Sequence, residues 1–233
     1  MAETGAAYCE ARPASTARKL LRLWPVILGV LVLAGLWSSP LVPLARRAFS
    51  PHMMLHLSVV TIASPLIAIG ALRIALVERV LRPTVATALA ASGFDLVVVW
   101  GWHAPILHDA AARHTPVFVF QQASFLAAGL LVWGLSFAGR TRRDAGLGAM
   151  ATAMTFMHMS MLGVLLSIAP HLLYSPDVCQ GAFGFTRLAD QRLGGALMAV
   201  WGGLPYLCGS LVLLARLVAE GGAAHPEGPS APE

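Results

Sequence analysis

The chain has 233 residues, of which 57% are apolar and only 12% carry a charge. Soluble domains usually contain about 25% charged residues, and here the charges fall in short clusters between long apolar stretches. This composition excludes an ordinary soluble domain and indicates a polytopic membrane protein. The net charge of +5 comes without a basic face, so we expect the lipid bilayer as a partner and no nucleic acid.

Six apolar stretches are long enough to cross a membrane, which takes roughly 20 helical residues. We expect these helices at Trp24–Leu44, Pro51–Leu72, Thr84–Trp102, Pro116–Ala138, Ala145–Ala169 and Leu193–Val218. The predicted fold class is all-α, a six-helix membrane domain over residues 24–218. Residues 1–23 and 219–233 are expected to be tails on the cytoplasmic side, disordered because they are rich in Ala, Gly and Pro.

The distribution of basic residues predicts the orientation, because cytoplasmic loops carry an excess of Lys and Arg. With the N-terminus inside, the inner side contains Arg12, Arg18, Lys19, Arg22, Arg73, Arg79, Arg82, Arg140, Arg142, Arg143 and Arg216. The outer side contains Arg46, Arg47, Arg113, Arg187 and Arg192. Both termini are therefore expected in the cytoplasm. Six of the eight histidines then lie on the outer side: His52, His56, His103, His108, His114 and His171.

The second predicted helix begins with two candidate metal ligands. His52 and His56 are four residues apart, which places both imidazoles on one helical face. Met53 lies three residues before His56 and can join that face. The pattern favours a pair of nitrogen ligands for one metal ion. The alternative is two interfacial histidines that bind water and lipid headgroups.

The fifth predicted helix carries a stripe of Met154, His158 and Met161, spaced at i, i+4 and i+7. Thioether sulfur favours Cu(I), and imidazole suits several transition metals. An ionisable residue inside the membrane is costly and usually functional, although the methionines alone are also typical of helix packing. We expect His158 to share one Cu(I) site with His52 and His56, with the methionines adding sulfur.

Five other residues are functional candidates. Trp102 and His103 end the third helix, as a belt tryptophan beside either a solvated or a ligating histidine. Asp95 lies inside that helix, where a charge costs roughly 2.5–3.5 kcal/mol, so it is paired, protonated or in a polar cavity. Asp190, followed by Gln191, precedes the last helix and is expected to cap its N-terminus.

Cysteine usage and motif content exclude several classes of function. Cys9, Cys179 and Cys208 are widely spaced and form no CxxC pair, so we expect neither a disulfide nor a thiolate metal site. No motif for hydrolytic or covalent catalysis occurs, and the protein is not expected to be an enzyme.

Several short motifs occur in an order that resembles one known family. They are Ser50-Pro-His-Met-Met-Leu-His56 with Pro65, Trp102-His-Ala-Pro105, Ser124–Trp133, His158 with Leu162–Leu166, Leu173-Tyr174, Ala189-Asp-Gln-Arg-Leu-Gly-Gly195 and Trp201–Tyr206. Together, from about residue 50 to residue 215, they resemble the multi-pass cytochrome c oxidase assembly factor family called CtaG.

The resemblance implies a protein of the bacterial inner membrane that helps haem-copper oxidases mature, by copper insertion. Oxidase subunits and a copper donor protein are the implied partners. The family's histidine pair falls on His52 and His56, its Trp-His motif on His103, its membrane histidine on His158, and its Asp-Gln pair on Asp190 and Gln191. Many members carry a Glu-His pair and an earlier His in the fourth helix. This chain has Gln121, Gln122 and Phe118 there, which weakens any site that used those groups.

Three functions remain open on the sequence. The first is a copper-handling assembly factor that holds Cu(I) near the outer face. The second is a haem-b redox subunit, with His56 and His158 as axial ligands. The third is an assembly scaffold without metal. A Soret band identifies the second, and metal analysis separates the first from the third.

Overall fold

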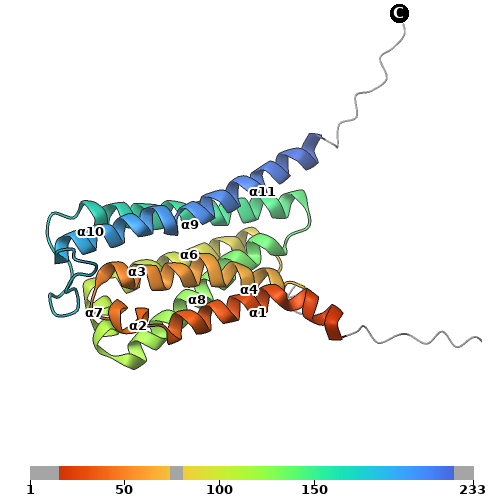
Figure 1. The fold of residues 1–233 in the computed structure, drawn as a ribbon. Helices are drawn as coiled ribbons and strands as arrows, with labels where there is room; N and C mark the ends of the chain where they lie inside the picture. The colour runs from red at the N-terminus through yellow and green to blue at the C-terminus, as the bar shows by residue number, and fades with distance from the viewer. Residues whose placement is uncertain (1–15, 74–80, 223–233) are drawn as a thin grey trace, which may run out of the picture.

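In the computed structural model, residues 16–73 and 81–222 are described, and their regular structure is entirely helical (Figure 1). The elements are α1 (Thr16–Ser38), α2 (Leu41–Ala45), α3 (Phe49–Ser58), η1 (Val59–Ala63), α4 (Ser64–Ala71), α6 (Val85–His103), α7 (Pro105–Arg113), α8 (Thr115–Ala138), α9 (Arg142–Ile168), α10 (Arg187–Leu197), η2 (Met198–Gly202) and α11 (Leu204–Gly222). The all-α prediction is confirmed for these residues.

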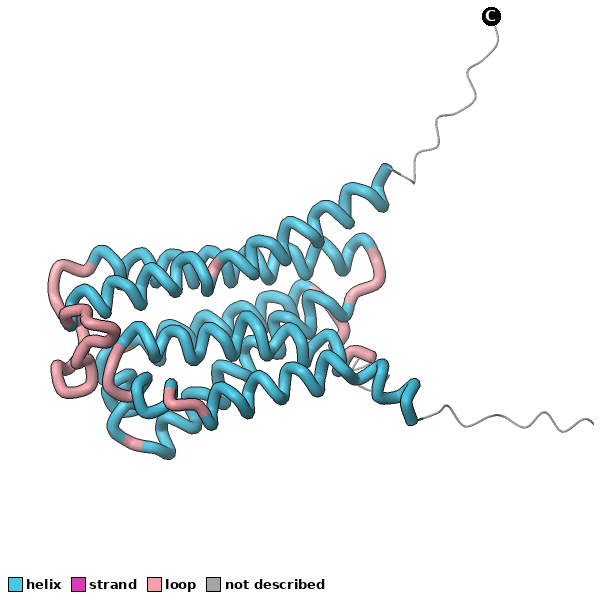
Figure 2. Tube along the Cα trace, viewed as in Figure 1, coloured by secondary structure: helices cyan, strands magenta, loops and turns pink. Residues whose placement is uncertain are grey.

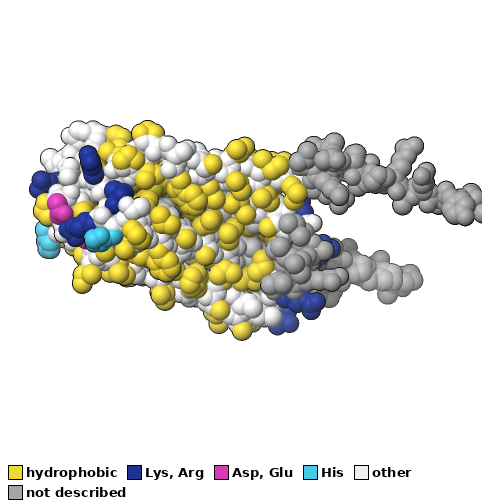
Figure 3. Space-filling view, turned by 90° about the horizontal axis from the view of Figure 1, so that it is seen from below, with side chains coloured by type: hydrophobic (Ala, Val, Ile, Leu, Met, Phe, Trp, Pro, Cys, Tyr) yellow, Lys and Arg dark blue, Asp and Glu magenta, His cyan; other side chains and the backbone are white. Residues whose placement is uncertain are grey.

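Five continuous helical stretches are long and apolar enough to span a membrane. They are Phe49–Ala71, Val85–His103, Thr115–Ala138, Arg142–Ile168 and Arg187–Ala219. Each overlaps one of the predicted spans. An apolar belt covers the middle of the molecule, charged side chains gather toward its two ends, and the visible histidines lie at one of them (Figure 3). The protein is therefore a membrane helix bundle.

The first predicted span is divided in the structure. Its helix α1 ends at Ser38, and the short α2 follows after Pro40. Proline lacks a backbone N–H and disfavours helical geometry in the preceding residue, which explains the break. The apolar stretch Leu23–Ser38 is shorter than the five spans, so a sixth span stays a prediction.

The ends of the described chain lie on the same side of the bundle. Figure 1 shows the start of α1 and the end of α11 at the end opposite α7. Helix α1 begins at Thr16, so residues 16–23, predicted as a disordered tail, are helical. Helix α11 likewise continues to Gly222, and Arg79 with the rest of both tails lies outside the described residues. The cytoplasmic location of the two termini stays a prediction.

Two of the spans contain a π-helical turn. In the first, η1 follows α3 directly below His56, and in the second, η2 joins α10 to α11. The wide turn of η1 leaves the Val60 carbonyl free to accept a hydrogen bond of 2.9 Å from the Trp133 ring N–H. The hydroxyl of Thr61 accepts one of 3.1 Å from Trp201. Such π-turns are frequent at functional sites, and these hydrogen bonds tie α8 and η2 to the helix that carries His52 and His56.

The loops gather at the two ends of the bundle (Figure 2). The longest, between α9 and α10, lies at the end where α7 also lies. It contains Cys179, which is a free, buried cysteine, whereas Cys208 of α11 is free and exposed. The expectation that these two cysteines form no disulfide is confirmed. This end of the bundle contains the candidate site.

Candidate functional site

Helix α3 places His52 and His56 side by side. Their ring centroids are 5.2 Å apart, and each residue is only 1% exposed. The shared helical face that their spacing predicts is therefore present. Both rings point into the bundle rather than toward lipid headgroups, so the interfacial interpretation does not describe them.

Two further histidines complete the group. His103 is the last residue of α6, with its ring centroid 5.4 Å from that of His56. His108 lies on α7, with its centroid 4.7 Å from that of His52. All four are buried, and we call His52, His56, His103 and His108 the histidine cluster. From the sequence, His108 was placed among the outer loops, and α7 was not predicted. Pro105 could have indicated this helix, because proline is favoured at the first position of a helix.

The ring nitrogens of the cluster have few hydrogen-bond partners. His52 donates from Nδ1 to the Ala45 carbonyl at 3.1 Å, and His103 donates from Nδ1 to the Val99 carbonyl at 2.6 Å. A proton on Nδ1 leaves the Nε2 lone pair of each ring available. The Nε2 of His103 and both ring nitrogens of His56 and His108 have no hydrogen-bond partner among the described residues. Buried polar atoms without partners are rare, and lone pairs of this kind suit a metal ion.

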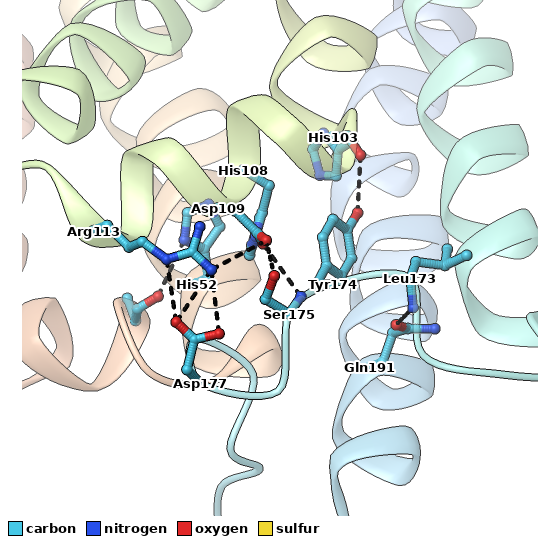
Figure 4. Close-up of polar contacts among 11 residues, drawn as sticks. His52, His103, His108, Asp109, Arg113, Leu173, Tyr174, Ser175, Asp177 and Gln191 are labelled. Atoms are coloured by element: carbon cyan, nitrogen blue, oxygen red, sulfur yellow. Dashed lines mark hydrogen bonds and ion pairs between the residues drawn. The ribbon is translucent and has the colours of Figure 1, made fainter.

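The loop between α9 and α10 covers the cluster (Figure 4). The Tyr174 ring lies 4.1 Å from that of His108 and 4.8 Å from that of Phe49, and its hydroxyl donates to the His103 carbonyl at 3.1 Å. The Ser175 hydroxyl donates to the Asp109 carboxylate. These contacts cover the cluster at this end of the bundle, where all four histidines are buried.

Charged residues of α7 lie at the edge of this cover. Asp109 Oδ1 is 3.6 Å from His108 Nδ1, and Arg113 forms an ion pair with Asp177 of the loop at 3.1 Å. The neighbouring His108 and the Ser175 hydroxyl lower the pKa of Asp109 to about 2. Burial lowers the pKa of His108, and Asp109 partly offsets this effect. His108 is therefore neutral at neutral pH and able to act as a ligand.

The arrangement does not form a closed coordination shell. Among the described residues, no three His, Cys, Asp or Glu side chains are placed to hold one metal ion in this conformation. The imidazole rings are packed against one another and against aromatic side chains. Phe125 stacks on His56 at 4.5 Å, and Phe118 lies 6.4 Å from His52.

Helix α8 faces the cluster without offering it an imidazole or a carboxylate. Phe118 stands beside His52, where the resemblance leads one to expect a histidine. Gln121 and Gln122 are buried, and within the described part of the chain Gln121 Nε2 and Gln122 Oε1 have no hydrogen-bond partner. Phe118, at the position where many family members have a histidine, therefore lies next to the cluster.

The structure does not bring His158 to His52 and His56. The ring of His158 lies against Asp95, with Nε2 and Oδ2 3.1 Å apart, and it makes none of the ring contacts that define the cluster. The expected three-histidine site is therefore not formed in this arrangement, because the His158 ring contacts Asp95 of α6 instead. The partner of Asp95, which the sequence left open, is His158.

The three methionines predicted as sulfur ligands do not contact the cluster as expected. Met53 is fully buried and packs against Gly194 of α10. Met154 and Met161 are 38% and 52% exposed on α9, on the surface that faces lipid. Trp102, predicted as a belt residue, is buried and donates to the Ser124 hydroxyl at 2.8 Å.

Asp190 caps a different helix from the one expected. Its carboxylate accepts hydrogen bonds from Phe49 N at 2.7 Å, Ser50 N at 3.3 Å and the Ser50 hydroxyl, all in the first turn of α3. The cap of α10 is Thr186. Asp190 therefore fixes the N-terminus of the helix that carries His52 and His56.

Gln191 holds the covering loop. Its side-chain oxygen accepts from Leu173 N at 2.8 Å, and its amide donates to the His171 carbonyl at 3.3 Å. The adjacent residues Asp190 and Gln191 thus connect α10 to the first turn of α3 and to the loop that covers the cluster.

Comparison with known proteins identifies the family. No curated protein and no solved structure has significant similarity to the chain. The sequence profile of the cytochrome c oxidase caa3 assembly factors, Caa3_CtaG, matches residues 5–220. That match covers nearly the whole chain and includes every residue of the histidine cluster. The chain belongs to the cytochrome c oxidase caa3 assembly factor family.

Proposed function

We propose that this assembly factor binds Cu(I) at the histidine cluster, on the outer side of the bacterial inner membrane, and passes it to a haem-copper oxidase subunit. The observation that carries the proposal is the set of unpartnered ring nitrogens at one buried point. His56, His103 and His108 each have at least one such nitrogen, and because a neutral imidazole has a single lone pair, each offers one ligand nitrogen. The copper itself is cargo, received from a donor protein and delivered to the oxidase.

Each histidine has a definable part in binding. The Nδ1–H groups of His52 and His103 are held by backbone carbonyls. An imidazole that binds metal usually donates its other N–H to such an acceptor, which fixes the ring orientation. His56 lies between these two rings, and His108 closes the outer side. Neighbouring ring centroids are 4.7–5.4 Å apart, so binding requires the rings to rotate until several nitrogens point at one ion.

Charge favours a monovalent ion. The cluster is formed by imidazoles, and the carboxylate in contact with it is that of Asp109, beside His108. A divalent ion would bring a larger uncompensated charge into a buried site, which is costly. Cu(I) carries one charge and accepts imidazole nitrogen. The lowered pKa of His108 supports binding at neutral pH, because the ligand is then the neutral ring.

The two alternative functions fit the structure less well. A haem held by His56 and His158 requires these rings to face each other across a porphyrin, whereas His158 lies against Asp95. A scaffold without metal gives no role to buried imidazoles that lack hydrogen-bond partners. Absence of a Soret band and presence of copper in purified protein are the outcomes that the proposal predicts.

The cellular test replaces two histidines of the cluster. In cells that lack the chromosomal gene, a His52→Ala/His56→Ala variant is expected to leave the oxidase short of copper, with activity close to that of cells without the factor. The matched control is His114→Ala, which removes an exposed histidine at the same end of the bundle. Oxidase activity and the copper-to-haem ratio of isolated membranes are measured at equal variant abundance. Full oxidase copper with the double variant contradicts the proposal.

A further inference from the structure

A second group of polar and sulfur side chains lies deeper in the membrane. Asp95 of α6 and His158 of α9 are 1% and 5% exposed, with Oδ2 and Nε2 3.1 Å apart. A charged aspartate at this depth costs roughly 2.5–3.5 kcal/mol on insertion scales. The carboxylate favours the tautomer with the proton on Nε2, which leaves the lone pair on Nδ1. Nδ1 has no hydrogen-bond partner among the described residues, and Nε2 lies 3.1 Å from the carboxylate without the geometry of a hydrogen bond.

His158 also forms part of a groove on the lipid-facing side of α9. The groove has a volume of about 470 Å³ and is lined by Met154, Phe156, Met157, His158, Ser160 and Met161. The three methionines are 38%, 67% and 52% exposed. Their spacing along the helix places them on the same face as His158. Three methionines and His158 thus line one groove that opens to the bilayer.

This combination of groups has the chemistry of a soft-metal site. A ligating histidine commonly donates its second ring N–H to a carboxylate, which orients the ring and strengthens it as a ligand; Asp95 is in the position for that role. Thioethers with one imidazole favour Cu(I) over harder ions. The single negative charge of Asp95 balances the single positive charge of Cu(I), so a loaded site is neutral within the membrane.

We propose that Asp95, His158 and the methionines Met154, Met157 and Met161 form a second Cu(I) site, separate from the histidine cluster. His158 and a subset of the thioethers supply the ligands, and Asp95 positions the imidazole and balances the charge. The groove opens sideways to lipid, whereas the cluster lies at the end of the bundle. The two sites hold one ion each, and binding at the second does not depend on the first.

The test measures Cu(I) bound by purified protein, in competition with a chromophoric Cu(I) chelator under reducing conditions. In the His52→Ala/His56→Ala background one Cu(I) is expected to remain. Adding Met154→Leu, Met157→Leu and Met161→Leu is expected to weaken that binding at least about tenfold. Leucine replaces methionine at similar volume, and these positions face lipid, so the fold is preserved. Asp95→Asn is also expected to weaken binding, because it removes the balancing charge.

The matched control is Met54→Leu, which changes a methionine of similar exposure, 37%, on α3. X-ray absorption of the loaded background protein is expected to show copper–sulfur scattering, which the triple leucine variant lacks. The reciprocal experiment places the three leucines in the wild-type chain, where bound copper is expected to fall from two ions to one. If the double-alanine background binds no Cu(I), or the leucine variants bind it as tightly and without change in scattering, the second site is wrong. If only the proposal for the histidine cluster is wrong, the wild type and the double-alanine background bind equal amounts of copper, which distinguishes that outcome from failure of the second site.

Discussion

Replacement of Asp190 by alanine is expected to lower the free energy of unfolding on the order of 3 kcal/mol, because it removes three hydrogen bonds to a charged acceptor. The carboxylate is fully buried and binds Phe49 N, Ser50 N and the Ser50 hydroxyl. Without it, the first turn of α3 has buried N–H groups and no acceptor. The favourable interaction of a carboxylate with a helix N-terminus is lost as well.

The measurement is the denaturant midpoint of detergent-solubilised protein, followed by helical circular dichroism. Asp190→Asn retains one acceptor oxygen and is expected to lose less stability than Asp190→Ala. The control is Asp177→Asn, which affects a carboxylate that is 63% exposed in an ion pair with Arg113; surface pairs contribute about 0–1 kcal/mol. A midpoint for Asp190→Ala as high as that of Asp177→Asn would mean that the cap is not important for stability.

Gly163→Ala is expected to destabilise the bundle by about 1–3 kcal/mol, the usual cost of overpacking a close contact. A Cβ at Gly163 would lie 2.3 Å from Ala199 N and 2.7 Å from the Gly195 carbonyl oxygen. Both are backbone atoms of the last span, so neither can move aside without shifting that helix. Small residues permit such close approach between membrane helices. The substitution therefore pushes α9 away from α10 and η2.

Gly146→Ala is the matched control, because it makes the same substitution in the same helix. There the nearest atoms to an added Cβ are side-chain carbons of Leu217 at 3.9 Å, which is an ordinary contact distance. Alanine is expected to leave stability unchanged or to raise it by up to about 1 kcal/mol, through its helix propensity. Thermal unfolding of the two variants in parallel measures the difference. Equal midpoints would contradict the tight backbone contact at Gly163.

Local patterns in the sequence predict those features of the site that lie on one helix. The four-residue spacing of His52 and His56 is enough to place them on one face of α3. The apolar lengths of five spans agree closely with the helices of the structure. The stripe of Met154, His158 and Met161 also lies on one surface of α9, at a single groove. Helical periodicity carries this information without any knowledge of tertiary contacts.

Contacts between distant segments could not be predicted in the same way. Asp190 caps a helix that begins about 140 residues earlier in the chain, and an N-cap inferred from sequence is assigned to the helix that follows it. His103 and His108 reach His52 and His56 only through the packing of α6 and α7 against α3. The partner of Asp95 is on α9, and no sequence spacing relates the two. For the same reason the sequence could not show that His158 contacts Asp95 instead of lying beside His52 and His56.

The most direct test of the central claim is the copper content of purified protein. Wild-type protein in detergent is loaded with Cu(I) under reducing conditions, passed through a desalting column and analysed for metal beside His52→Ala/His56→Ala and the exposed-site control His114→Ala. The proposed function predicts that the double variant loses one Cu(I) per chain and that His114→Ala loses none. Equal copper in the wild type and the double variant would contradict metal binding at the histidine cluster.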